Sequence, residues 1–198
     1  MARRSDHTRP ELEELIVSEG YRQMEEIGFA RFSARELAKR IGYSVGTLYN
    51  VFGSYDRLML AINARTVTLW AAYLREQLRD AGGDRIECLV RSYFAFAHSH
   101  QNSWAAIYDH RLPKGEAMPE WYGAVIGDLI GIVVAEVADV LPDAKRSQAN
   151  ELARSLLATV HGHCMFTLTG TFALLGETSP QEAAISRVRE GIAAASLP

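Results

Sequence analysis

The sequence predicts an all-α protein with an N-terminal helix–turn–helix domain and a larger C-terminal helical domain. Apolar residues recur three and four positions apart along most of the chain, and no stretch alternates as a strand would. Two short helical patterns joined by a tight turn lie between Ser33 and Phe52. Further on, Gly82-Gly83 and the proline-containing segment 111–119 interrupt the helical pattern. We expect domains at residues 1–57 and 58–198, joined through a rigid helix.

The two short helices have local signals at both ends. Ser33 can cap the first helix, and Glu36, three residues later, completes a capping box. Gly42 accepts the left-handed backbone of a sharp turn, and Ser44 is the next N-cap. Each helix has one apolar side, formed by Leu37, Ala38 and Ile41 in the first and by Val45, Leu48, Val51 and Phe52 in the second.

The opposite side of the second helix is the candidate DNA-reading surface. It presents Gly46, Thr47, Tyr49 and Asn50 outward. An exposed tyrosine suits a phosphate or base-edge contact, and Gly46 lets the positive helix N-terminus approach a nucleic-acid backbone. The basic residues Arg31, Arg35, Lys39 and Arg40 surround one acid, Glu36. A helical hairpin without a DNA-binding role has the same spacing, so that alternative stays open.

Residues 32–61, FSARELAKRIGYSVGTLYNVFGSYDRLMLA, resemble the N-terminal domain of the tetracycline-repressor (TetR) family of bacterial transcriptional regulators. The matching features are the Gly28-Phe29 turn, the Ser33 cap, Leu37-Ala38, Ile41-Gly42, the run from Gly46 to Tyr49, and Phe52 followed by a short turn and Leu58. The chain departs from the family at Tyr55, where a lysine usually helps to hold a DNA phosphate. Tyr55 can donate one hydrogen bond but brings no charge.

The resemblance implies a homodimer whose two recognition helices read operator DNA. Arg35 and Tyr49 would contact phosphates or base edges, and Val45, Gly46 and Asn50 would face the bases. The predicted DNA-binding residues are Ser33, Arg35, Ser44, Val45, Gly46, Thr47, Tyr49, Asn50 and Tyr55. The last two long helices would pair with those of a second subunit, through small residues (Ala153, Ala158, Gly162, Gly170) and apolar ones (Leu156, Leu168, Leu174, Ile185).

The C-terminal domain carries the predicted effector site. Tyrosine and tryptophan side chains keep a polar end, so several together often line an apolar pocket with a few polar groups. The segment TVHGHCMFTLTG, residues 159–170, resembles the His-Gly segment of some TetR ligand domains. The predicted ligand-binding residues are Tyr73, Phe94, Trp104, Tyr108, Trp121, Tyr122, His161 and Phe166. Without a buried Arg or Lys cluster, we expect a small, apolar or aromatic effector whose binding releases the operator. Ordinary core packing of these aromatics is the alternative.

Composition excludes several other classes of protein. No uncharged apolar run is long enough to span a membrane, and two cysteines do not form a disulfide framework, so we expect a cytoplasmic protein. His161 and Cys164 share a helix face, but a metal site would need His98 or His110 from elsewhere, and no third catalytic group accompanies them. We therefore predict no metal, no cofactor and no enzymatic activity.

The net charge is −3, yet three arginines, Arg3, Arg4 and Arg9, lie in the first ten residues. They form either a solvated tail or a DNA-contacting arm.

Beyond the helix–turn–helix, the pattern predicts helices over residues 8–28, 55–81, 84–100, 102–110, 120–141, 143–175 and 181–195.

Overall fold

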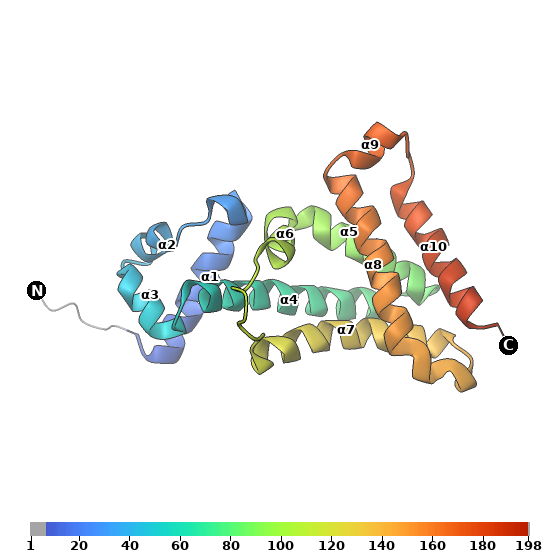
Figure 1. Cartoon of the computed structure of the whole chain (residues 1–198), viewed down its shortest axis with the longest axis horizontal. Coiled ribbons are helices and arrows are strands. Elements are labelled where there is room, and N and C mark those ends of the chain that lie inside the picture. The colour runs from blue at the N-terminus through green and yellow to red at the C-terminus, as the bar shows by residue number, and fades with distance from the viewer. Residues whose placement is uncertain (1–6, 198) are drawn as a thin grey trace, which may run out of the picture. The chain divides into compact units, whose positions relative to one another are not determined.

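The computed structural model describes residues 7–197, and within that range it is helical without strands, which confirms the all-α prediction. Arg3 and Arg4 lie outside the described residues. The helices of Figure 1 are α1 (Arg9–Ile27), α2 (Ala34–Arg40), α3 (Val45–Phe52), α4 (Tyr55–Asp80), α5 (Arg85–Ser99), α6 (Gln101–Asp109), α7 (Glu120–Val140), α8 (Ala149–Leu168), α9 (Thr171–Leu175) and α10 (Pro180–Ala195), with 3₁₀ turns η1 (Phe29–Arg31) and η2 (Asp143–Gln148). No helix among these residues is long and apolar enough to cross a membrane.

The predicted helix over residues 143–175 is wrong as a single element. It is divided into η2, α8 and the short helix α9. The break between α8 and α9 falls at Gly170, whose φ of +75° is left-handed. Glycine adopts this conformation without the steric cost that a Cβ would bring, and it commonly ends helices. Gly176, also at φ +75°, ends α9 in the same way. The other predicted helices agree with the observed ones to within one or two residues.

The chain forms two compact units. The first contains the described residues up to 69 together with residues 100–126, and the second contains residues 70–99 and 127–197. Helices α4 and α7 contribute residues to both units. The predicted boundary between residues 57 and 58, which separates a DNA-binding from an effector-binding domain, stays a prediction.

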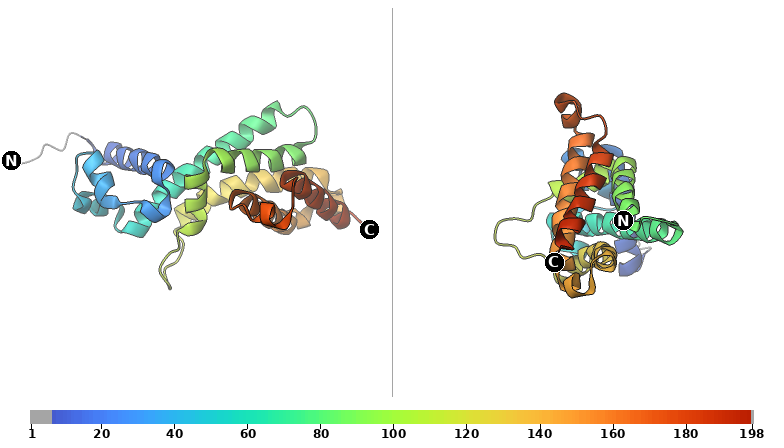
Figure 2. Two further views of the ribbon diagram at one scale, coloured as in Figure 1. Left: turned by 90° about the horizontal axis from the view of Figure 1, so that it is seen from above. Right: turned by 90° about the vertical axis from the view of Figure 1, so that its right-hand side faces the viewer.

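The first unit is built around one apolar cluster. Its fully buried members include Ile16 of α1, Leu37 of α2, Leu48 of α3 and Leu58 of α4. Ala106 of α6 belongs to the same cluster, and α6 lies against α1 (Figures 1 and 2). Buried Gly20 allows α1 and α4 to approach closely, because a Cβ there would lie 2.5 Å from Cδ1 of Ile62.

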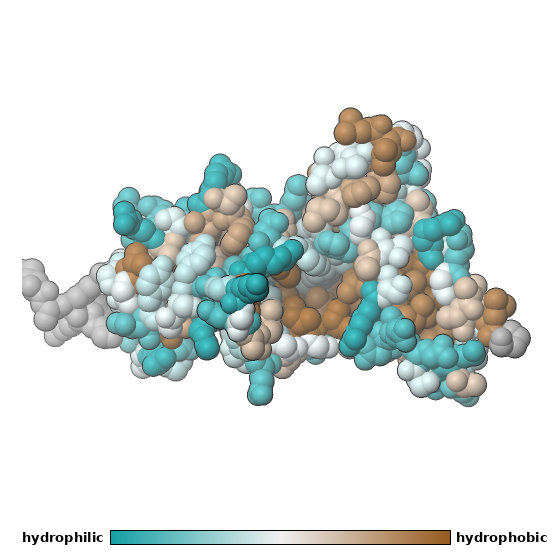
Figure 3. All heavy atoms as spheres, in the orientation of Figure 1, coloured by the Kyte–Doolittle hydropathy of each residue, from teal (hydrophilic) through white to brown (hydrophobic). Residues whose placement is uncertain are grey.

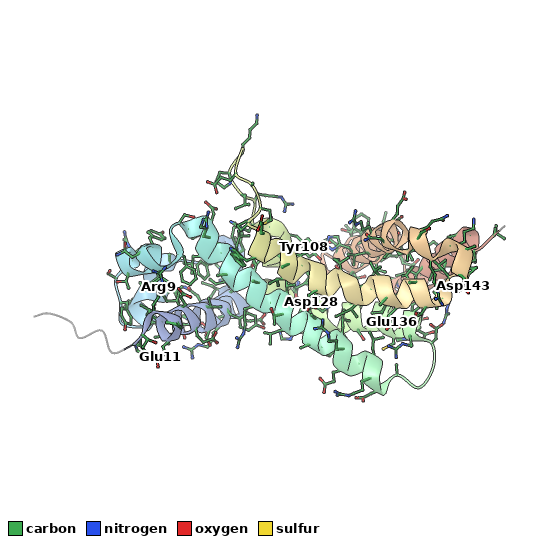
Figure 4. The ribbon with its side chains drawn as sticks, turned by 90° about the horizontal axis from the view of Figure 1, so that it is seen from below. Arg9, Glu11, Tyr108, Asp128, Glu136 and Asp143 are labelled. Carbon is green, nitrogen blue, oxygen red and sulfur yellow. The ribbon has the colours of Figure 1, made fainter. Side chains whose placement is uncertain are left out.

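In the second unit, α8 and α10 run side by side and are joined through α9 (Figure 1). Gly191 of α10 permits this packing, since a Cβ there would lie 2.8 Å from Cδ2 of Leu156. Arg85 at the start of α5 forms two hydrogen bonds of 2.6 Å with the carboxylate of Glu136 on α7. Glu136 is labelled in Figure 4. The surface over α9 is apolar in Figure 3. Leu174, which belongs to α9, is 88% exposed.

Candidate functional site

The helix–turn–helix forms at its predicted caps. The Ser33 hydroxyl accepts a hydrogen bond from the Glu36 N–H (3.3 Å), and the Ser44 hydroxyl accepts one from the Thr47 N–H (3.1 Å). Gly42 has a φ of +74°, the left-handed backbone that the turn requires. The second half of the predicted capping box, a bond from the Ser33 N–H to the Glu36 carboxylate, is not formed; that carboxylate lies 3.8 Å from Nζ of Lys39. The local sequence signals therefore place α3 as expected.

Helix α3 presents the predicted outward side to solvent. Leu48 is fully buried, whereas Tyr49 is 37% exposed and Gly46 and Asn50 are exposed. Val45 and Thr47 are half-buried, and Val45 packs against the core cluster of the first unit. The outward side of α3 thus brings together a glycine near its N-terminus, a phenol and an amide.

Of the flanking candidates, Arg35 is exposed on α2, and Ser33 and Tyr55 are half-buried. The Tyr55 ring lies 6.5 Å from the ring of Phe32, between centroids. Burial raises the pKa of the Tyr55 phenol, and the neighbouring Tyr49 and Asp56 raise it further. Tyr55 therefore remains a neutral hydrogen-bond donor at neutral pH, at the position where the family usually has a cation.

The basic cluster is partly neutralised by acids that the local sequence does not reveal. Nη1 of Arg40 lies 3.3 Å from Glu19 and 2.8 Å from Glu26, both on α1. These hydrogen bonds, led by the one to Glu26, raise the pKa of Arg40. Arg31 donates to the Ile27 carbonyl at the end of α1 (3.0 Å). Arg35 and Lys39 are thus the more accessible cations of the predicted cluster.

The segment just before α1 also contacts the helix–turn–helix. Nδ1 of His7 lies 2.8 Å from the hydroxyl of Tyr43, and Nη2 of Arg9 donates to the carbonyl of Val51 (3.2 Å). Between them, the Thr8 N–H donates to the Glu11 carboxylate (2.7 Å), as part of a capping box at the start of α1. Sequence analysis missed the contacts of His7 and Arg9, because their partners lie 36 and 42 residues away.

Four predicted ligand-binding residues belong to the first unit. Trp104 is buried on α6, and its ring centroid lies 5.1 Å from that of Tyr108. Tyr122 on α7 is buried, and burial, with a contribution from Tyr108, raises its pKa to about 12. Trp121 is 44% exposed, with its ring perpendicular to that of Tyr122.

Polar contacts tie α6 to α1 and α4. Near its start, Nδ2 of Asn102 donates to the Glu25 carbonyl (2.7 Å), and the Ser103 hydroxyl donates to the Glu25 carboxylate. In the middle of α6, the Ala106 carbonyl accepts a 3.1 Å bond from Asn63 of α4. After its end, Nε2 of His110 lies 3.0 Å from Asp56 in the first turn of α4.

The other four candidates belong to the second unit, where the structure brings only some of them near a shared cluster. His161 Nδ1 lies 2.9 Å from the hydroxyl of Tyr93, whose ring packs edge-on against Trp70 at 4.9 Å. Phe96 stacks on Trp70 (5.2 Å, 4° between planes) and contacts Tyr73 at 5.8 Å. Burial lowers the pKa of His161.

Phe94 and Phe166 lie apart from that cluster. Phe94 lines an open groove of about 450 Å³ formed by α5, α8 and α10. Phe166 is 44% exposed and packs edge-on against Phe172 of α9, with centroids 5.4 Å apart.

The histidines and the cysteine of α8 have separate surroundings. Nδ1 of His163 lies 2.8 Å from the Thr159 carbonyl of its own helix, whereas His161 contacts Tyr93. Cys164 is buried, and burial raises the pKa of its thiol to about 12. Within residues 7–197, no three His, Cys, Asp or Glu side chains come together in a way that could hold a metal ion.

Comparisons with known proteins cover both parts of the chain. Residues 16–62 match the family described as "Bacterial regulatory proteins, tetR family", and residues 86–189 match "Tetracyclin repressor-like, C-terminal domain". A search of curated proteins found no match.

Several solved structures share the fold. A protein of unknown function from Rhodococcus sp. RHA1 is 19% identical, with a TM-score of 0.72 over 99% of this chain and 100% of that one. The candidate regulatory protein SCO4313 is 22% identical, with a TM-score of 0.69 over 91% and 96%. The multidrug binding protein EbrR, complexed with imidazole, is 18% identical, with a TM-score of 0.63 over 94% and 96%. At these identities the similarity is one of fold.

Proposed function

This chain belongs to the TetR family of bacterial regulatory proteins, and we propose that it is a ligand-responsive repressor. In this proposal a homodimer occupies operator DNA and releases it when a small molecule binds the C-terminal helices. The observation that carries the proposal is the outward side of α3. There Gly46, Tyr49 and Asn50 are exposed on a helix whose opposite side, at Leu48, is fully buried.

We propose that α3 enters the major groove with Tyr49 and Asn50 towards the DNA. Thr47 and Ser44 lie at its N-terminus, where backbone N–H groups and hydroxyls suit a phosphate. Arg35 adds an exposed cation from α2. Tyr55 contributes a neutral donor in place of the usual lysine, so the electrostatic part of the affinity is expected to be smaller than with that lysine.

The proposed effector is apolar or aromatic. Support comes from the aromatic residues of each unit, Trp104, Tyr108 and Tyr122 in one and Tyr73 and His161 in the other. The contacts of α6 with Glu25, Asn63 and Asp56 offer a route to the helix–turn–helix, because α6 carries Trp104 and Tyr108 and shares a compact unit with α1–α3. A ligand that favours one arrangement of α6 and α4 by 1–3 kcal/mol would change operator affinity by roughly 5- to 150-fold.

We propose that α8 and α10 form the dimer interface. Ala158, Gly162 and Phe166 follow one another at four-residue spacing on one side of α8, and Ala158 and Phe166 are exposed in the single chain. Ala153, Leu156 and Ile185, which the sequence also suggested for this interface, are instead buried within the chain. The apolar residues of α8 therefore lie on two sides of the helix. Ala158, Gly162 and Phe166, with the exposed Gly170 and Leu174 that follow α8, are the ones that can meet a partner.

The test is fluorescence anisotropy with a labelled duplex from the DNA directly upstream of the gene. A scrambled duplex of equal length and composition is the competitor, and the titration is repeated across a salt series. We expect competitor-resistant binding whose log affinity falls linearly with log salt concentration. The bound complex then serves to screen apolar and aromatic compounds for release of the DNA.

Binding that is equally weak on the native and scrambled duplexes, and on every fragment of a genomic library, would contradict the proposed function. Operator binding that no compound relieves would leave a DNA-binding protein without the proposed response to a ligand.

A further inference from the structure

The short segment from His7 to Arg9 contacts the turn that leads into α3 and the last turn of α3. His7 meets Tyr43, in the turn before α3, through the 2.8 Å contact between Nδ1 and the hydroxyl, and the two ring centroids are 6.1 Å apart. Arg9 donates to the carbonyl of Val51 in the last turn of α3. These two contacts join residues that precede or begin α1 to the two ends of the proposed recognition helix.

We propose that His7 and Arg9 are positioning residues that hold α3 in the orientation that reads operator bases. The inference rests on the proposed DNA-binding function and adds two residues to it. Neither side chain needs to touch DNA for this role, because each acts through a group of the helix–turn–helix.

The contact of Arg9 fits the chemistry of a helix C-terminus. The last carbonyls of a helix have no partner within it and carry a partial negative charge. At the end of α3, the Gly53 N–H bonds to the Tyr49 carbonyl (2.7 Å), and the Arg9 guanidinium bonds to that of Val51. Figure 4 shows Arg9 in the first turn of α1, on the side towards the helix–turn–helix. Glu13, one turn further along α1, holds Nε of Arg9 at 3.1 Å and so restricts the guanidinium.

The contact of His7 acts on the other end of α3. Tyr43 lies between Gly42, which sets the turn, and Ser44, which caps α3. Its ring packs against the core cluster of the first unit, and its hydroxyl is held by His7. A displacement of Tyr43 therefore moves the first residue of α3.

The hydrogen bonds of Thr8 fix the backbone of this segment. Because the Thr8 N–H and hydroxyl both bond to the Glu11 carboxylate, the backbone at the start of α1 is fixed. The neighbours of Thr8, His7 and Arg9, are thereby directed to Tyr43 and to Val51. A small rotation of α3 about these supports would displace Tyr49 and Asn50 together, so operator binding should suffer more than binding to unrelated DNA.

The experiment measures binding of the full-length dimer to operator and scrambled duplexes for Arg9→Gln and His7→Phe. Arg22→Gln is the matched control, since Arg22 is an equally exposed arginine of α1 whose partner is Glu19 of the same helix. We expect Arg9→Gln and His7→Phe to weaken operator binding by about three- to tenfold, the usual effect of one lost hydrogen bond. Binding to the scrambled duplex and the salt slope should stay unchanged, urea unfolding should show that both variants are fully folded under the binding conditions, and Arg22→Gln should behave as the wild type.

For His7, a double-mutant cycle with Tyr43→Phe tests the pairing. The combined variant should bind no more weakly than the weaker single variant, and additive losses would overturn the role assigned to His7. For Arg9, an equal loss on both duplexes with a salt slope reduced by about one would indicate a direct phosphate contact and overturn positioning.

If operator binding by the variants falls only in proportion to the fraction of unfolded protein, both assignments are overturned. Unchanged operator binding in both variants, with a wild type that discriminates operator from scrambled DNA, would refute this inference alone. A wild type that does not discriminate would refute the proposed function instead.

Discussion

Tyr49 is the strongest single candidate for a DNA contact. Its phenol is exposed on a short helix, so packing in the core does not explain its presence there. It is 37% exposed, and its neighbour Leu48 holds α3 in the core. We predict that Tyr49→Ala weakens operator binding by about tenfold, the loss of one phosphate or base-edge contact, while the thermal midpoint changes little. Anisotropy and circular dichroism measure the two effects. An exposed residue of the first unit away from α3, Met118→Ala, is the control, and unchanged operator affinity in folded Tyr49→Ala would contradict the proposed docking.

His161 gives the stability of the protein a pH dependence whose sign follows from its burial. Burial lowers its pKa below the ordinary 6.5, so near pH 6 the unfolded chain binds more protons at this site than the folded one. The contribution of His161 to stability is therefore present above pH 6.5 and is lost as the pH falls through 6.5 towards the lower, folded-state pKa. In His161→Asn, the drop in the free energy of unfolding between pH 7.5 and 5.5 should be smaller than in the wild type. Urea titrations at both pH values measure this drop, with exposed His98→Asn as the control, and an equal drop in His161→Asn and the wild type would contradict the assignment.

Among the elements, the turn between α1 and η1 depends on one glycine. Gly28 has φ +73° and ψ 167°, and a Cβ there would lie 3.1 Å from Oδ1 of Asn102 at the start of α6. Gly28→Ala should lower the free energy of unfolding by about 1–3 kcal/mol, because this backbone region is essentially restricted to glycine. Gly83→Ala, where an added Cβ would lie within 4 Å of no atom beyond its chain neighbours, should change it by less than about 0.5 kcal/mol. Chemical denaturation followed by helicity compares the two, and equal effects would refute the role of Gly28.

For the secondary-structure elements, sequence patterns predict some features and miss others. Caps such as Ser33 and Ser44, and the buried side of α3 at Leu48, follow from spacings of three or four residues and were predictable. The ion pairs of Arg40 with Glu19 and Glu26, and the contact of Ser103 with Glu25, depend on how α1 packs against α2 and α6, which no local pattern encodes. Periodicity also identifies an apolar side without saying what covers it. Leu156 and Ile185, expected to face a partner, are therefore buried within their own chain.

For the whole molecule, the decisive property is the proposed pairing of two chains. A carboxylate at Ala158, on the exposed side of α8, would be buried without a partner in the dimer. We predict that Ala158→Glu is monomeric at concentrations where the wild type is dimeric and that it binds the operator about a hundredfold more weakly, because two linked half-site contacts become one. Sedimentation velocity and anisotropy measure the two effects. Ala144→Glu, at an exposed position of η2, should alter neither, and a dimeric Ala158→Glu would exclude α8 from the interface.

The place of α6 in the first unit has a practical consequence for building hybrid regulators. Ala106 packs in the same cluster as Leu58, Met59 and Ile62, and Asn63 bonds to its carbonyl. A hybrid that takes only residues 7–57 would join the proposed DNA-reading helices to a foreign α4 and α6, whose side chains were never matched to Ile16 or Gly20. Transplanting residues 7–69 together with 100–126 would carry the whole cluster across, so sensors with exchanged operator preference should be assembled from these two segments.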